Sequence, residues 1–149
     1  MRGKVNEISI SYKERINLSH SPNINSSIDA AEVLYEQWDK NNIELHESFK
    51  VLLLNNSNKV KGIYELSKGG MTGTLVDMRI LFATVLKSLS VGIILAHNHP
   101  SGKLQASNSD IELTKKIKNA AELFDIKVLD HLIIVPDGNY YSFADNDII

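Results

Sequence analysis

Hydrophobic and polar residues repeat with two different periods along this chain, and each period predicts a kind of element. Continuous apolar runs that end at turn residues predict buried strands. These runs lie at residues 51–54, 91–96 and 127–135. The turn residues of 55–58 predict that 59–66 returns as the antiparallel partner of the first run. In the same way, Pro136 to Asn139 predicts that 140–143 returns as an edge strand.

Apolar residues that recur every three or four positions predict three amphipathic helices. The helices are expected from Ser26 or Ser27 to about Lys40, from about 76 to 89, and over 108–124. The first helix would bury Ile28, Ala31, Leu34, Tyr35 and Trp38. The second would bury Val76, Ile80, Leu81, Val85, Leu86 and Leu89, with Thr74 and Asp77 as its cap. The third would bury Leu113, Ile117, Ala120 and Phe124, with Ile111 and Ala121 widening the stripe.

The first 25 residues differ from the rest of the chain. Ile8, Ile10 and Tyr12 alternate with serines, which predicts one strand over 7–12, and the Asn- and Ser-containing residues after it read as a loop. The domain organisation that we expect is therefore an N-terminal strand and loop extension over 1–25, followed by a single α/β domain over 26–149.

Composition narrows the class of protein. A chain of 149 residues with 43% hydrophobic and 23% charged residues is typical of one soluble globular domain. No apolar run has the length of a membrane span, and the N-terminus lacks the apolar stretch of a secretory signal. The absence of cysteine excludes disulfides and thiolate metal sites and favours a cytoplasmic location. The net charge of −2 argues against a large contact surface for DNA.

Candidate chemistry is concentrated just after the run 91–96, in His97-Asn98-His99-Pro100-Ser101-Gly102. Residues i and i+2 of an extended segment point to the same side, so His97 and His99 can converge on one point. Pro100 and Gly102 then turn the chain away. Two imidazoles with a carboxylate a short loop later, Asp110, are the ligands that a zinc or similar divalent ion requires.

Ser107 and Asp110 also have a purely structural interpretation. They precede and open the third predicted helix, and the pattern S-x-x-D resembles a capping box. Asp110 in a first helical turn also suits the helix dipole without a metal. The sequence alone does not choose between a cap and a metal site.

The spacing H-x-H, seven residues, S, two residues, D resembles the metal signature of the JAMM/MPN-type metallopeptidases. The finer sequence HNHPSG, together with Leu129-Asp130-His131-Leu132-Ile133-Ile134, is similar to the RadC branch of that superfamily. The likeness runs from about Glu47 to near the C-terminus. It implies a three-layer α/β domain of the JAMM/MPN, cytidine-deaminase-like type, with a mixed central sheet flanked by helices.

The resemblance also implies roles for individual residues. His97, His99 and Asp110 would hold Zn²⁺ with water in the fourth position, which is the arrangement of a catalytic site. Glu47, just ahead of an apolar strand, matches the glutamate that binds the metal-bound water and acts as general base. The Ser107 hydroxyl would stabilise the oxyanion. The expected activity is hydrolysis of a peptide or isopeptide bond in a peptide or protein substrate.

Other interpretations remain open at this point. A non-hydrolytic metal-binding module associated with DNA repair or recombination is the alternative function, and the oligomeric state is not readable. His131 is either a core histidine or a partner of a metal ligand. The glycine-rich segment 69–74 favours a connector over a phosphate loop, because it lacks the Gly-Lys-Ser/Thr ending. Zinc-dependent base deamination of the usual form is excluded, because it needs cysteine ligands.

Overall fold

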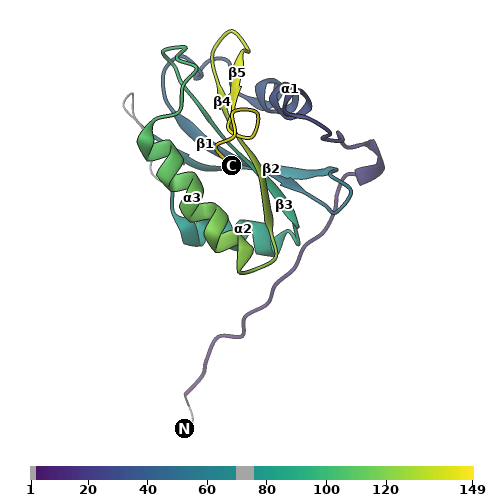
Figure 1. Ribbon diagram of the computed structural model, residues 1–149. Coiled ribbons are helices and arrows are strands. Elements are labelled where there is room, and N and C mark those ends of the chain that lie inside the picture. The colour runs from purple at the N-terminus through teal and green to yellow at the C-terminus, as the bar shows by residue number, and fades with distance from the viewer. Residues whose placement is uncertain (1–2, 70–75) are drawn as a thin grey trace.

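The computed structural model describes residues 3–69 and 76–149, which form one mixed sheet with helices on both faces (Figure 1). The strand order is β2-β1-β3-β4-β5. The strands are β1 (Ser48–Leu54), β2 (Val60–Lys68), β3 (Gly92–Asn98), β4 (Lys127–Ile134) and β5 (Tyr140–Ser142). The helices are α1 (Ser27–Gln37), α2 (Met78–Lys87) and α3 (Asn108–Glu122), with a short 3-10 turn η1 (Leu18–His20). The predicted α/β class with a mixed, flanked sheet is confirmed.

Strand pairing follows the predicted hairpins. β1 and β2 pair antiparallel, and β5 pairs antiparallel with β4 at the other edge. β1 also pairs antiparallel with β3, while β3 and β4 are parallel and are joined through α3. A parallel pair needs such a crossover, because the connection must bring the chain back to the end of the sheet where the first strand began. The beginning of α3 therefore lies near the C-terminal end of β3.

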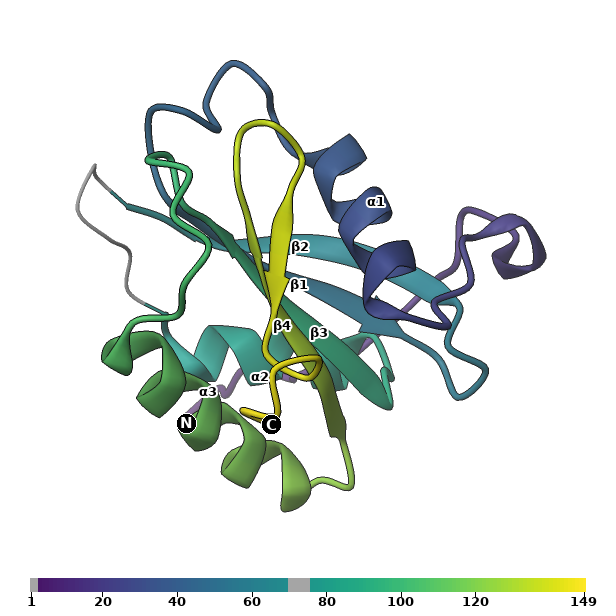
Figure 2. The same ribbon diagram turned by 45° about the horizontal axis from the view of Figure 1, so that its top comes forward.

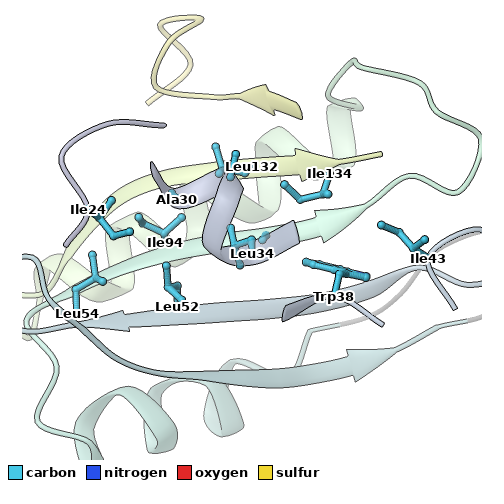
Figure 3. Packing of buried hydrophobic residues seen from close by; sticks show 12 residues of the cluster. Ile24, Ala30, Leu34, Trp38, Ile43, Leu52, Leu54, Ile94, Leu132 and Ile134 are labelled. Carbon is cyan, nitrogen blue, oxygen red and sulfur yellow. The ribbon is translucent and has the colours of Figure 1, made fainter. Parts of the chain in front are cut away.

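Each face of the sheet carries its own hydrophobic core, because successive side chains of a strand point to opposite faces. On one face, α1 packs against even-numbered residues of the central strands, as the side chains of Leu34, Leu52, Ile94 and Leu132 illustrate (Figure 3). The other face is covered by α2 and α3 (Figure 2). The core there contains odd-numbered strand residues such as Leu95. The result is a three-layer domain.

The predicted strand over 7–12 is wrong. Residues 3–14 have no regular secondary structure, and in Figure 1 this segment extends away from the domain. Ile8 and Ile10 are exposed despite the alternating pattern. Alternation fits a strand only where a sheet edge pairs with it, and no described strand does so here.

The predicted helix faces are correct in part. Leu81 and Val85 of α2 and Ile117 and Ala121 of α3 are buried as predicted, but the helices rotate so that Phe82 and Thr114 are buried beside them. Several residues assigned to the apolar stripes are instead exposed: Ile28, Ile80, Leu86, Leu89 and Phe124. A helical stripe does not show where a helix axis sits over the sheet, so residues at its margin are assigned poorly.

Part of the prediction falls outside the described residues. Most of the glycine-rich segment 69–74 and the proposed cap Thr74 lie within 70–75. The other proposed cap of α2 is confirmed, because the Asp77 carboxylate accepts hydrogen bonds from the backbone N–H groups of Arg79 and Ile80. Among the described residues, no helix combines the length and apolar character needed to span a bilayer.

Candidate metal centre

The register of β1 against β3 brings Glu47 to the histidines. Phe49 pairs with His97, and the strands run in opposite directions. Glu47, two residues before Phe49, therefore falls beside His99, two residues after His97. The distance from Glu47 Oε1 to His99 Nε2 is 4.0 Å, and both side chains are mostly buried. Residues 52 positions apart in sequence thus meet at one end of the paired strands β1 and β3.

His97, His99 and Asp110 converge on one point, as their spacing predicted. His97 Nε2 lies 3.1 Å from His99 Nε2 and 3.4 Å from Asp110 Oδ2. The distance from His99 Nε2 to the same carboxylate oxygen is 3.9 Å. Within the part of the chain that the structure describes, this is the group of acidic and histidine side chains with the spacing of a metal site.

The chemistry of these three atoms fits a bound cation. His99 Nδ1 lies 2.7 Å from the carbonyl oxygen of Lys103, which can only accept, so Nδ1 carries a proton and Nε2 of the neutral ring presents a lone pair. A ring nitrogen lone pair beside another ring nitrogen and a carboxylate oxygen is repulsive unless a proton or a metal ion lies between them. Tetrahedral ligands about 2.0–2.1 Å from zinc stand about 3.3 Å apart, which is similar to the observed separations. The residues present therefore fit a zinc-like ion.

Asp110 is both a ligand candidate and a helix-capping residue. Its Oδ2 accepts a 3.0 Å hydrogen bond from the backbone N–H of Ser107, and the Ser107 hydroxyl oxygen accepts one of 3.0 Å from the N–H of Asp110. This is the capping box that the sequence suggested. The cap fixes the carboxylate at the start of α3, facing the histidines, so capping and metal binding are compatible for Asp110.

The electrostatics of Asp110 favour a cation at this point. Burial by itself would raise the pKa of its carboxyl. Where a proton on His97 Nε2 takes the place of a metal ion, the hydrogen bond and charge of His97, with the hydrogen bonds to Ser107, outweigh burial and hold the pKa of Asp110 well below its usual range. Asp110 is therefore an anion at neutral pH, and a positive charge beside His97 stabilises it.

The Ser107 side chain uses only part of its hydrogen-bonding capacity in the cap. Its oxygen accepts from the Asp110 N–H, whereas a hydroxyl also has one proton to donate. The cap is observed. The predicted oxyanion role of Ser107 stays a prediction, as does the general-base role of Glu47.

His131 contacts a metal-ligand candidate from inside the core. It is fully buried on β4, its Nε2 lies 2.8 Å from His97 Nδ1, and its Nδ1 lies 2.6 Å from the Thr114 hydroxyl. Desolvation by burial, with repulsion from His97, lowers the pKa of His131 well below its ordinary value, so it is neutral. Both interpretations of His131 thus hold, since it is a core residue and a partner of His97.

Asn98 is the residue of the site that sequence analysis missed. Asn98 stands between the two histidines in the sequence and is fully buried. Its Oδ1 accepts a 2.7 Å hydrogen bond from the Ser48 N–H. Its Nδ2 donates to the carbonyl oxygens of Ile43 and His46 at 2.9 and 2.8 Å. Asn98 therefore ties β3 to the segment that ends in Glu47. An asparagine inside a buried strand was the available signal, because a buried amide must find partners.

Comparison with known proteins agrees with this geometry. The family model described as RadC-like JAB domain matches residues 24–148. A UPF0758 protein of Flavobacterium johnsoniae is 55% identical over 103 residues, which cover 69% of this chain and 44% of that protein. A UPF0758 protein of Chlorobaculum parvum is 30% identical over 149 residues, which cover 99% of this chain and 67% of that protein. The chain spans less than half the length of the first of these relatives.

Proposed function

Because the chain belongs to the RadC-like JAB domain family, we propose that it is a zinc-dependent hydrolase that cleaves a peptide or isopeptide bond. The observation that carries this proposal is the convergence of His97, His99 and Asp110 with Glu47 at 4.0 Å from His99. Three protein ligands with a neighbouring carboxylate outside the ligand set are typical of a catalytic rather than a structural site.

The ligand set supports zinc as the metal. His97 and His99 would bind through Nε2 and Asp110 through Oδ2, the atoms that face one another. Imidazole and carboxylate ligands without thiolate suit zinc, which would supply a Lewis acid and a water with a pKa near neutrality. Proton transfer and stabilisation of the oxyanion would be the work of neighbouring side chains.

Glu47 would hold the proton that is moved during hydrolysis. Its carboxylate would accept a proton from the attacking water and return it to the leaving amine, which is the work of a general base followed by a general acid. The Ser107 hydroxyl keeps its proton free of the cap and would donate it to the oxygen that becomes negative in the transition state. Each of the two residues would thus have a role distinct from metal binding.

The first experiment measures metal content. Purified protein supplied with zinc is expected to hold about one ion per chain, whereas His97→Ala and Asp110→Ala should lose it. His20→Ala is the matched control, because His20 is an exposed histidine of η1 outside the cluster. If the native chain holds no zinc, the proposal is wrong.

A cleavage assay then tests the hydrolase. Fluorogenic peptides and isopeptide-linked lysyl peptides are incubated with the zinc-loaded protein and with its Glu47→Gln variant. We expect Glu47→Gln to keep its zinc and lose at least about 100-fold in rate, because it removes the base and not a ligand. Stoichiometric zinc with no cleavage of either library would instead favour a non-hydrolytic metal-binding module.

A further inference from the structure

A chain of hydrogen bonds connects a metal-ligand candidate to the interior of the domain. It runs from His97 on β3 to His131 on β4, then to Thr114 on α3, and ends at the backbone carbonyl of Asp110. The separations are 2.8, 2.6 and 2.7 Å in that order. His131 and Thr114 are completely buried, so no solvent contact competes with these bonds.

The direction of each hydrogen bond follows from counting protons. The Asp110 carbonyl oxygen can only accept, so the single hydroxyl proton of Thr114 points to it. The Thr114 oxygen must then accept from His131, which places a proton on His131 Nδ1. Since the ring is fully buried and its two hydrogen bonds among the described residues go to His97 and Thr114 rather than to a carboxylate, His131 is neutral and its Nε2 accepts.

The same count determines the state of His97. Because His131 Nε2 accepts, His97 Nδ1 must donate, and in the neutral ring His97 Nε2 is left with a lone pair. That nitrogen is the one that faces His99 and Asp110. We propose that His131, oriented by Thr114, is a positioning residue that holds His97 in the tautomer able to bind the metal.

Ring stacking supports this role by fixing both imidazoles. The His131 ring stacks on Phe143 with centroids 4.3 Å apart, and the His97 ring lies parallel to Phe49 at 6.0 Å. Neither ring can therefore turn to exchange its two nitrogens without disturbing the core. A side chain that only filled space at position 131 would satisfy the packing and leave His97 Nδ1 without an acceptor.

This series of hydrogen bonds also places two metal-ligand candidates, His97 and Asp110, relative to each other. Thr114 lies one helical turn after Asp110, so its hydroxyl can form hydrogen bonds with both the Asp110 carbonyl and His131. The start of α3, which carries the Asp110 ligand, is thereby linked to β4 and through it to His97. This inference rests on the proposed metal site, but it concerns residues that do not touch the metal.

The first test measures zinc affinity by competition with a coloured chelator. Thr114→Val keeps the side-chain volume and removes the hydroxyl, and His131→Phe keeps a ring without nitrogens. Both should bind zinc about 10- to 100-fold more weakly, which is the usual effect of losing the partner of a ligand. Thr114→Ser keeps the hydroxyl and should restore affinity to within about threefold of the native value.

A matched control separates the hydroxyl at this site from hydroxyls in general. Thr84 also donates to the carbonyl four residues before it, on α2, and has no contact with the histidines. Thr84→Val should therefore bind zinc as the native chain does. Variants are compared only if their circular dichroism spectra show the native fold; should His131→Phe fail to fold, Thr114→Val and Thr114→Ser still decide the question.

The second test reads the tautomer directly. Nitrogen NMR of the zinc-free protein at alkaline pH should show His97 protonated at Nδ1 and bare at Nε2, and Thr114→Val should change this pattern. If Thr114→Val keeps both the native zinc affinity and the native His97 signals, the proposed role is wrong. If the native chain binds no zinc, the proposed function fails, while the His97 signals still test the positioning by His131.

Discussion

The side-chain oxygen of Asn98 accepts a 2.7 Å hydrogen bond from the backbone N–H of Ser48. This bond joins the segment that bears both histidines to the residue after Glu47. The two residues are 50 positions apart and belong to β3 and β1. Asn98 also binds two carbonyl oxygens of the preceding segment, at Ile43 and His46. All three hydrogen bonds leave from one buried side chain.

Replacing Asn98 with alanine should therefore destabilise the domain. The change leaves one buried N–H and two carbonyl groups without their partner, and the expected loss is about 2–4 kcal/mol in the free energy of unfolding. Urea denaturation measures it, with Asn56→Ala, at an exposed turn residue, as the control. The Ser48 amide should also exchange faster with deuterium, and unchanged protection of this amide would contradict the role of Asn98.

Ser107 should show the energetics of an N-cap. Its hydroxyl oxygen accepts the Asp110 N–H, so Ser107→Ala is expected to cost about 1 kcal/mol and Ser107→Gly only a few tenths. Thermal and urea unfolding of the two variants measure the difference. Equal stability of Ser107→Ala and the native chain would mean that the cap contributes nothing. Because Ser107→Gly removes the hydroxyl at little cost in stability, it is the variant in which to test the oxyanion role.

The rotation of α3 against the sheet predicts which of its apolar residues stabilise the fold. Ile117 is fully buried, whereas Leu123 is 83% exposed just after the helix. Ile117→Ala should cost about 2–5 kcal/mol because it creates a cavity, and Leu123→Ala should change stability by less than about 0.5 kcal/mol. A similar loss in both variants would show that the helix buries another face.

Removal of residues 1–14 should leave the stability of the domain nearly unchanged. Residues 3–14 are exposed throughout, and Val5 and Ile8 contribute nothing to either core. Lys61 of the domain lies over the Tyr12 ring, with Nζ 4.4 Å from the ring centroid. We expect a melting temperature within about 2 °C of the native value, because a single exposed cation–π contact is weak. A larger decrease would indicate that the segment packs on the domain.

Asp130 should make stability depend on pH. Its buried carboxylate accepts hydrogen bonds from Ser142, His131 and Ala144. Burial, aided by the charge of Asp145, nevertheless raises the pKa of Asp130 above its ordinary value of 3.8. A carboxyl with a raised folded-state pKa contributes stability that is fully present below the unfolded pKa and lost as pH rises through the folded one.

The comparison with Asp130→Asn isolates this contribution, because asparagine does not titrate. The stability advantage of the native chain over Asp130→Asn should therefore be larger at about pH 4 than at about pH 7. Urea unfolding of both proteins at several pH values measures the advantage. An advantage that grows with pH would mean that the hydrogen bonds outweigh burial and that the folded-state pKa is lowered.

The sequence by itself determined the elements of the sheet and helices and the three metal-ligand candidates. Periodicity is local, so apolar runs and helical stripes located β1, β3, β4 and the three helices within a few residues. The ligand set is local as well. His97 and His99 share one side of one strand, and Asp110 follows after a short loop at the start of the next helix.

Tertiary structure decided everything that depends on partners distant in the chain. Residues 7–12 alternate as a strand does but find no sheet edge, and the helices turn Leu86 and Phe124 outward. The contacts of His131 with His97 and Thr114, and of Asn98 with the segment before β1, join elements whose relative placement no local pattern encodes. That placement is set by how the two cores pack on opposite faces of the sheet. The packing thus decides which neighbours hold the site residues in position.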